Sequence, residues 1–308
     1  MSILVTGGAG YIGSHATQAL VENGHQVVVY DNLSHGHRQA VHKGARFIEG
    51  DVGDDRKVRE VIKSFRVESV MHFAAFIEVG ESVTDPYKYY QNNFSNTLSF
   101  LKTLKETGVT RIVFSSTAAV YGNPTTIPIP ESHILNPINP YGRSKMMVEF
   151  ALEDAAKASG LGYACLRYFN VAGASADAMI GEDHEPESHL IPRVLQAAGG
   201  KSTVSVFGGD YPTRDGTCIR DYVHVEDLIS AHLLALEAIE SGTGQIYNIG
   251  SENGFTVKEV IQSCKKVTGL PIEVRHEDRR PGDPPVLIAS SKKIRENLGW
   301  KPKYPELD

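Results

Sequence analysis

Two short motifs, far apart in this chain of 308 residues, hold residue types that could serve a single redox reaction. The first is the glycine-rich run Thr-Gly-Gly-Ala-Gly-Tyr-Ile-Gly at residues 6–13, directly after an apolar segment. The second places Tyr141 and Lys145 four residues apart. A glycine turn of this kind is typical of dinucleotide sites, and a tyrosine beside a cation can move the proton that accompanies hydride transfer. Together the motifs indicate a nicotinamide enzyme that oxidises an alcohol.

The glycine run has the spacing G-x-x-G-x-x-G, not the G-x-G-x-x-G of the dehydrogenase fingerprint. Gly7 permits a tight turn, Gly10 lets the backbone approach a pyrophosphate, and Gly13 lets helix and strand pack closely. We therefore predict a dinucleotide cradle made of Gly7, Gly10, Tyr11, Ile12 and Gly13.

An acidic residue, Asp31, ends the second apolar run of the chain. Its carboxylate can hold the 2′-hydroxyl of an adenine ribose and would repel a 2′-phosphate. No arginine follows it until Arg38. The predicted cofactor is therefore NAD rather than NADP.

The spacing of Tyr141 and Lys145 puts both side chains on one face of a helix. An unperturbed tyrosine has a pKa of about 10 and is a poor base at neutral pH. A nearby ammonium and a positive nicotinamide ring favour the phenolate and are expected to lower that pKa. Hydroxyls from Ser115 and Thr117 end the preceding strand. We predict Tyr141, Lys145 and Thr117 as the catalytic residues.

Strands and helices alternate along the first part of the chain. Expected strands are 3–5, 26–30, 46–51, 69–73, 111–115 and 162–168, and expected helices are 14–23, 58–65, 97–106 and 141–158. This alternation predicts an α/β fold, a doubly wound parallel sheet of Rossmann type with helices on both faces.

After Asn170 the pattern weakens, and a smaller, loop-rich α/β substrate domain is expected. Residues 222–225 and 247–249 are expected to return to the main sheet. The predicted division is 1–169 plus 221–250 for the dinucleotide and 170–220 plus 251–308 for a nucleotide sugar. The chain ends where a capping helix is expected to begin.

Composition excludes several other classes. A net charge of −6 and the lack of a basic block argue against nucleic-acid binding. No apolar stretch approaches the ~20 residues of a membrane helix, and the N-terminus does not resemble a signal peptide. Three scattered cysteines favour a reducing, cytoplasmic location over a disulfide framework.

The two motifs, Asp31 and the 115–117 hydroxyls resemble the extended short-chain dehydrogenase/reductase family. Further blocks narrow the resemblance to the UDP-glucose 4-epimerases of that family. These blocks are Gly50-Asp51-Val52, His72-Phe73-Ala74-Ala75, Val79-Gly80-Glu81-Ser82, Leu166-Arg167-Tyr168-Phe169-Asn170, Gly208-Gly209-Asp210-Tyr211, Arg220-Asp221-Tyr222-Val223-His224 and Arg279-Arg280-Pro281-Gly282-Asp283.

The resemblance implies further site residues and a homodimer. On the cofactor side these are Asn32, Asp51, Val52, Phe73, Ala74, Asn92, Ser115 and Tyr168, with Tyr141 and Lys145 shared between cofactor and catalysis. On the substrate side they are Thr117, Asn170, His189, Leu190, Phe207, Arg220, Arg280, Asp283 and Leu287. Arginine forks suit a diphosphate, and an aspartate suits ribose hydroxyls.

Three positions depart from the family pattern. Ile77 stands where some members carry a lysine near the cofactor, and His189 stands where others carry asparagine. Leu287 replaces a tyrosine found in members restricted to glucose and galactose. The last departure leaves open whether N-acetylated sugars are also substrates.

The predicted activity is interconversion of UDP-glucose and UDP-galactose through a 4-keto intermediate, with NAD tightly bound. A 4,6-dehydratase or decarboxylase is the nearest alternative, although Thr117 is followed by Ala118 and Ala119 rather than by proton-transferring residues. A non-catalytic NAD sensor is more distant, since such proteins typically lose the tyrosine or lysine. Residues 182–189 are rich in Glu and His but lack a recognised ligand spacing, so no metal is predicted.

Overall fold

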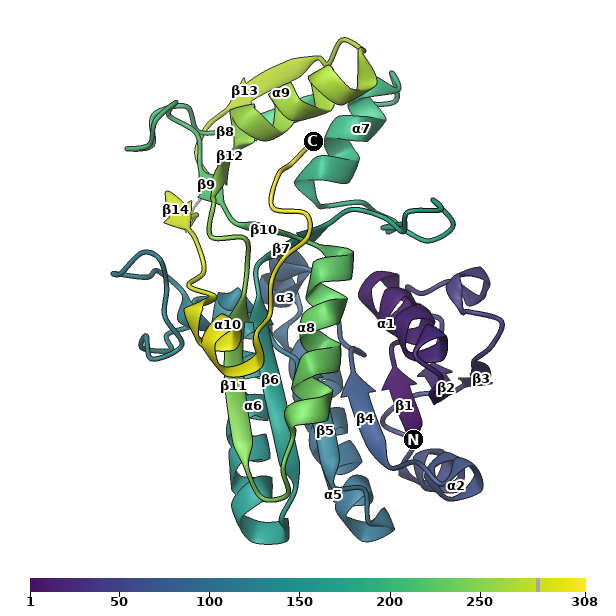
Figure 1. Ribbon diagram of the computed structural model, residues 1–308. Coiled ribbons are helices and arrows are strands. Elements are labelled where there is room, and N and C mark those ends of the chain that lie inside the picture. The colour runs from purple at the N-terminus through teal and green to yellow at the C-terminus, as the bar shows by residue number, and fades with distance from the viewer. Residues whose placement is uncertain (281–282) are drawn as a thin grey trace.

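A computed structural model describes residues 1–280 and 283–308 (Figure 1). Pro281 and Gly282, part of the predicted block 279–283, lie outside the described residues. The main sheet has seven parallel strands in the order β11-β6-β5-β4-β1-β2-β3. They are β1 (Ser2–Thr6), β2 (Gln26–Asp31), β3 (Arg46–Glu49), β4 (Ser69–His72), β5 (Arg111–Ser115), β6 (Gly162–Tyr168) and β11 (Gly244–Ile249).

The strand order reverses between β1 and β4, which creates a crevice at the carboxyl ends of these two strands. Ligands of open α/β sheets bind at such a point because the connections leave it in opposite directions. The doubly wound parallel sheet predicted from the alternating pattern is confirmed.

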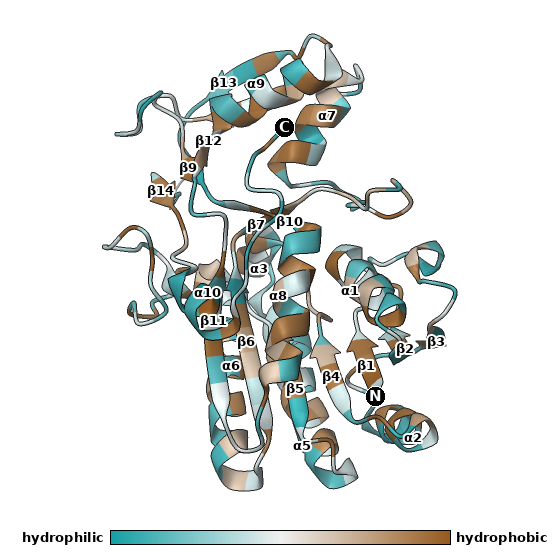
Figure 2. Ribbon diagram, viewed as in Figure 1, coloured by the Kyte–Doolittle hydropathy of each residue, from teal (hydrophilic) through white to brown (hydrophobic). Residues whose placement is uncertain are grey.

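Helices cover both faces of this sheet (Figure 1). One face packs against α1 (Tyr11–Glu22), α8 (Val225–Ala238) and α10 (Lys292–Leu298), and the other against α2 (Asp55–Phe65), α5 (Thr97–Thr107) and α6 (Pro140–Ser159). Side chains alternate along β1, so Ile3 and Val5 join the first core and Leu4 joins the second. In Figure 2 the covering helices combine hydrophobic and hydrophilic residues, as expected for helices with one buried face.

Between β4 and α5 the chain forms short helical pieces that the sequence pattern did not predict. They are α3 (Val79–Thr84), α4 (Pro86–Tyr89) and a π-helical segment (Tyr90–Asn96) that continues into α5. Asp85 caps α4 through a hydrogen bond from the Lys88 backbone, and Pro86 occupies its first turn. Pieces of four to seven residues are too short to display a helical period.

The smaller part of the chain, which holds the remaining strands, forms the upper part of Figure 1. It contains α7 (Leu190–Ala198), α9 (Val257–Thr268) and small sheets from β7 (Asn170–Ala172), β8 (Val204–Phe207), β9 (Ile219–Arg220), β10 (Tyr222–His224), β12 (Phe255–Thr256), β13 (Val274–Glu277) and β14 (Val286–Leu287). The segment 172–188, which was expected to be irregular, forms no helix or strand except at Ala172, the last residue of β7.

One predicted pairing is wrong. β10 does not enter the main sheet but pairs with β7, with Tyr222 opposite Asn170. The edge beside β6 is occupied instead by β11, which was correctly predicted to return to the sheet. Local sequence marks 222–225 as extended, but it does not specify which edge the strand meets, and Val225 already belongs to α8.

Candidate active site

The glycine run forms a tight loop between β1 and α1 in which backbone atoms leave no room for a side chain at positions 7 and 13. Gly7 has a φ of +72°, and a Cβ there would lie 2.6 Å from the backbone nitrogen of Ala74. A Cβ on Gly13 would overlap the carbonyl oxygen of Gly7. Gly10 is the N-cap of α1 and carries no side-chain cap. The close approaches assigned to Gly7 and Gly13 are thus required by this backbone.

The N-terminus of α1 has the properties of an anion site. Backbone N–H groups in the first turn of a helix, here those of Tyr11, Ile12 and Gly13, have no partner within the helix. No acidic side chain lies in that turn to compete with a phosphate. The loop and helix start therefore fit the pyrophosphate of a dinucleotide.

Asp31, at the end of β2, is buried and is hydrogen-bonded on both carboxylate oxygens. Its Oδ2 accepts from the Ala9 backbone at 2.9 Å, and its Oδ1 accepts from the Leu33 backbone at 2.8 Å. The carboxylate that sequence reasoning assigned to the adenine ribose thus also ties the glycine loop to β2. Each oxygen still has a lone pair free for a ribose hydroxyl.

The remaining predicted cofactor residues lie at or beyond the carboxyl ends of neighbouring strands. Asn32 donates to Asp51 at 2.7 Å, which joins the segments after β2 and β3, and Val52 is buried beside them. Phe73 and Ala74 directly follow β4. Asn92 is in the π-helical segment, where its amide donates to the Asn93 side chain at 3.0 Å.

The proton-transfer residues come from β5, α6 and β6. Lys145 is buried, and its ammonium donates to the Ser115 carbonyl at 2.8 Å. The Ser115 hydroxyl contacts the Tyr168 hydroxyl, and the Thr117 side chain favours the ionised form of the Tyr141 phenol. Asn139 caps α6 and Pro140 occupies its first turn, so the helix begins directly beside the strand end that carries the hydroxyls.

Burial opposes charge on both members of the tyrosine–lysine pair. It raises the pKa of Tyr141, a rise that the hydrogen bond from Thr117 partly offsets. It lowers the pKa of Lys145 to about 7, against the opposing charge of Glu149. The sequence predicted a lowered tyrosine pKa from the lysine charge. In this structure burial is the largest effect on the phenol, and it raises the pKa of Tyr141 instead.

Sequence reasoning missed a buried network behind these residues. Arg167 donates to Glu149 at 2.9 Å and to the Tyr121 hydroxyl at 2.9 Å, while the Ser116 hydroxyl contacts the same glutamate. Glu149 lies one turn after Lys145 on α6, so the network fixes this helix against β5 and β6. An arginine within an otherwise apolar strand was the available signal.

A cavity of about 210 Å³ lies in the upper part of the molecule. Its lining includes most of the predicted substrate residues: Asn170, His189, Leu190, Phe207, Arg220, Arg280 and Asp283. It also includes residues that the sequence did not single out, among them Arg193, Cys218 and Tyr222.

Two arginines are preorganised in this cavity. The Arg280 guanidinium stacks 3.9 Å from the centroid of the Phe207 ring. Arg220 donates to Asp283 at 3.1 Å and to the Pro284 carbonyl at 2.9 Å. Two guanidinium groups, one of them stacked on an aromatic ring, suit the binding of a nucleoside diphosphate.

Leu287 lies outside that lining. On β14 it is paired with Arg220, and its side chain packs against the apolar cluster of Val120, Tyr121 and Ile129, which also contacts Ala118. Ile77, the other apolar departure, is exposed.

His189 precedes α7 and is held by two carboxylates. Its Nδ1 lies 2.7 Å from Glu182 and 3.2 Å from Glu187. Burial disfavours its charged form, but the hydrogen bond and charge of Glu182 outweigh it and raise the pKa to about 9. The irregular loop 182–189 therefore brings carboxylate and imidazole side chains together, although their spacing in the sequence did not predict this cluster.

A doubly wound parallel sheet, a glycine cradle at its switch point and a tyrosine–lysine pair at the start of α6 define a dinucleotide-binding protein of the extended short-chain dehydrogenase/reductase type. The model of the NAD dependent epimerase/dehydratase family matches residues 3–250, so the chain belongs to that family. Within the described residues, no helix is both long and apolar enough to cross a membrane.

Several relatives match over the whole chain. It is 52% identical to the UDP-glucose 4-epimerase of Halalkalibacterium halodurans, covering 100% of this chain and 92% of that protein. The UDP-glucose 4-epimerase of Brucella ovis in complex with NAD superposes with a TM-score of 0.96 at 46% identity, covering 100% and 95%. The UDP-Glc/GlcNAc 4-epimerase of Campylobacter jejuni gives a TM-score of 0.87 at 44% identity, covering 99% and 95%.

Proposed function

We propose that this protein interconverts UDP-glucose and UDP-galactose by epimerisation at C4 of the sugar, with NAD tightly bound. The observation that carries the proposal is the adjacency of two sites. The Tyr141–Lys145 pair lies at the carboxyl edge of the sheet, and the arginine-lined cavity follows at Asn170, two residues beyond the end of β6. The relatives named above support the same reaction.

In this proposal one part of the chain binds NAD and the other part binds the nucleotide of the substrate. Residues 1–169 with 221–250 hold NAD through the glycine cradle, Asp31 and the predicted cofactor residues that follow the strands. Residues 170–220 with 251–308 hold the uridine diphosphate through the lining of the cavity that contains Arg220 and Arg280. Anchoring through the nucleotide leaves the sugar free to turn between the two half-reactions.

Each catalytic residue has a distinct task. Tyr141 accepts the proton of the sugar 4-hydroxyl in one half-reaction and returns a proton in the other. The Thr117 hydroxyl favours the ionised phenol, and Lys145, one helical turn away and fixed on the Ser115 carbonyl, supplies positive charge when it is protonated. NAD held by the glycine cradle and Asp31 would supply the hydride acceptor and donor for C4 of the sugar.

The structure disfavours the alternative dehydratase reaction, because elimination needs an additional acid and base beside the sugar. The positions after Thr117 are Ala118 and Ala119, in a short helical turn that ends at Tyr121. Neither alanine can transfer a proton.

The test is incubation of the purified protein with UDP-glucose and no added NAD, followed by chromatography of the products. We expect UDP-galactose, and NAD or NADH released on denaturation. A 4-keto-6-deoxy product would instead assign a dehydratase, and absence of turnover together with absence of bound nucleotide would overturn the proposal.

A second substrate class is proposed from Leu287. An N-acetyl group at C2 needs space while the sugar turns, and leucine occupies less volume than the tyrosine of restricted members. The relative from Campylobacter jejuni is described as acting on both UDP-Glc and UDP-GlcNAc. We expect measurable activity on UDP-N-acetylglucosamine alongside UDP-glucose.

We also propose a homodimer in the cytoplasm. Leu98 of α5 and Phe150 of α6 are about half exposed, and these two helices are neighbours on the same face of the sheet. Exposed apolar side chains on adjacent helices favour self-association. The three cysteines are all unpaired, which suits a reducing compartment. Light scattering on the purified protein tests the dimer, and Phe150→Glu should shift it toward monomer.

A further inference from the structure

The irregular loop before α7 brings together four side chains that could ligate a metal ion. They are Glu182, His184, Glu187 and His189, and one donor atom from each lies within 4.8 Å of all the others. The two glutamate side chains are 7% and 5% exposed, so both carboxylates are nearly removed from solvent. Within the described residues, the ion pairs of both glutamates involve only these two histidines.

The separations between donors are close to those of a tetrahedral site. Ligands about 2.0–2.1 Å from zinc are about 3.3 Å apart in that geometry. His184 Nδ1 lies 3.3 Å from Glu182 Oε1 and 3.9 Å from Glu187 Oε2, and His189 Nδ1 lies 3.2 Å from the other oxygen of Glu187, Oε1. His189 Nδ1 and Glu182 are closer, at 2.7 Å, so this distance must increase when a metal ion binds.

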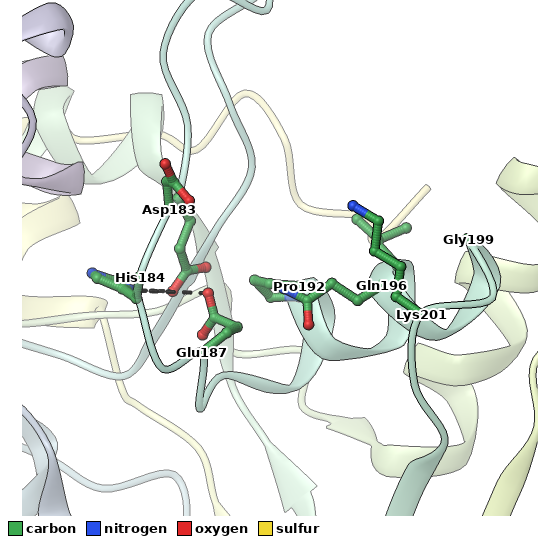
Figure 3. Close-up of a pocket in the computed structure, with 9 residues that line it drawn as sticks. Asp183, His184, Glu187, Pro192, Gln196, Gly199 and Lys201 are labelled. Atoms are coloured by element: carbon green, nitrogen blue, oxygen red, sulfur yellow. Dashed lines mark ion pairs between the residues drawn. The ribbon is translucent and has the colours of Figure 1, made fainter.

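The state of His184 is a separate indication. Its Nδ1 is buried and has no hydrogen-bond partner, although it lies near two carboxylates. A buried polar atom without a partner is costly, and a cation between the imidazole and the carboxylates would remove that cost. Figure 3 shows His184 and Glu187 facing each other at the wall of a cavity of about 380 Å³, which gives the cluster access from outside.

We propose that Glu182, His184, Glu187 and His189 bind one divalent transition-metal ion, zinc by the preference of two imidazoles and two carboxylates. Four protein ligands close the coordination sphere, so the site is structural rather than catalytic. Because His189 also lines the nucleotide cavity, the ion would fix the loop beside that cavity. The ligation uses Nδ1 of His189 and leaves Nε2 free.

The experiment uses the full chain without a histidine tag, stripped with a chelator and titrated with Co²⁺ and then Zn²⁺. We expect one ion per chain, a visible absorption band of four-coordinate cobalt, and displacement of that band by zinc. Zinc should also raise the Tm, because it binds only the folded chain. His184→Ala should abolish the band and weaken zinc binding at least about tenfold.

His37→Ala is the matched control. This histidine is exposed and lies 3.3 Å from Asp183 in the same region, but it is not one of the four donors. It should bind zinc like the wild type. If His184→Ala does not fold, Glu187→Gln replaces it, with the same expected loss. No uptake by the wild type, or equal weakening in the control, would overturn the proposal.

Discussion

Tyr141 and Lys145 are placed where neither carries its charge easily. Burial raises the pKa of the phenol and lowers the pKa of the ammonium to about 7. The residue types and their spacing could be predicted from the sequence. The balance between burial and charge could not, because it depends on how α6 packs against β5.

Removing the phenol oxygen tests its role directly. Tyr141→Phe keeps the ring and its packing but removes the proton carrier. We expect turnover to fall by about 10²- to 10⁴-fold with UDP affinity retained, measured by steady-state kinetics and calorimetric titration of UDP. Turnover near the wild-type value would assign the base to another group.

Removing the ammonium should shift the pH profile. In Lys145→Met the phenolate loses a favourable cation, so the pKa of Tyr141 rises further and the rate–pH curve moves to higher pH, with a lower rate at neutral pH. Lys157→Met, on the exposed part of the same helix, is the control and should leave the curve unchanged. An unshifted curve in the first variant would contradict the electrostatic role.

Leu287 is the residue on which the proposed substrate range depends. Leu287→Tyr fills space beside the cluster of Val120, Tyr121 and Ile129. We expect it to remove activity on UDP-N-acetylglucosamine while retaining activity on UDP-glucose, compared by kcat/KM for each. Equal losses on both sugars would mean that the residue affects packing rather than substrate range.

Among the structural elements, the loop between β1 and α1 is the one on which the predicted binding of NAD depends. Gly13→Ala places a methyl group against the Gly7 carbonyl, so the loop must open. We expect loss of most co-purified NAD, measured after denaturation. Gly80→Ala is the control, because its Cβ meets nothing within 4 Å and Gly80 is exposed on α3. Full NAD content in Gly13→Ala would contradict the cradle.

The elements also show where sequence reasoning works. Apolar runs such as 26–30 and 162–168 bury both faces of a parallel strand, and that requirement is visible in their composition. β10 has an equally apolar run, yet its partner is β7, a choice made by tertiary contacts. The sequence did not predict a metal site in the 182–189 loop, because ligand spacings are recognised mainly on regular helices and strands. In an irregular loop, the backbone conformation decides which of the four donors come together, and the sequence spacing does not show it.

For the whole molecule, three buried histidines make stability depend on pH. Burial lowers the pKa of His72 to about 3 and that of His15 and His232 to about 4. In the unfolded chain each binds a proton near pH 6.5, whereas the folded chain does not until far lower pH. The unfolded state therefore binds more protons, and the free energy of unfolding falls as pH decreases from about 6.5 toward 4.

The expected slope is up to about 4 kcal/mol per pH unit below pH 6, from three protons at about 1.4 kcal/mol each. Urea unfolding at pH 7 and pH 5.5 measures it, with a lower midpoint expected at pH 5.5. His72→Gln should reduce the pH dependence by about one third. Equal stability at the two pH values would show that these histidines are already protonated in the folded state.

The two hydrogen bonds accepted by Asp31 have a consequence for how this protein could change. A switch of preference to NADP requires losing the carboxylate, since it repels a 2′-phosphate. Here that loss also frees the backbone N–H groups of Ala9 and Leu33, and with them the anchor between the pyrophosphate loop and β2. Cofactor choice and loop integrity are coupled through one side chain. A single substitution at this position would weaken binding of both dinucleotides, so a switch would need a compensating change in the loop first.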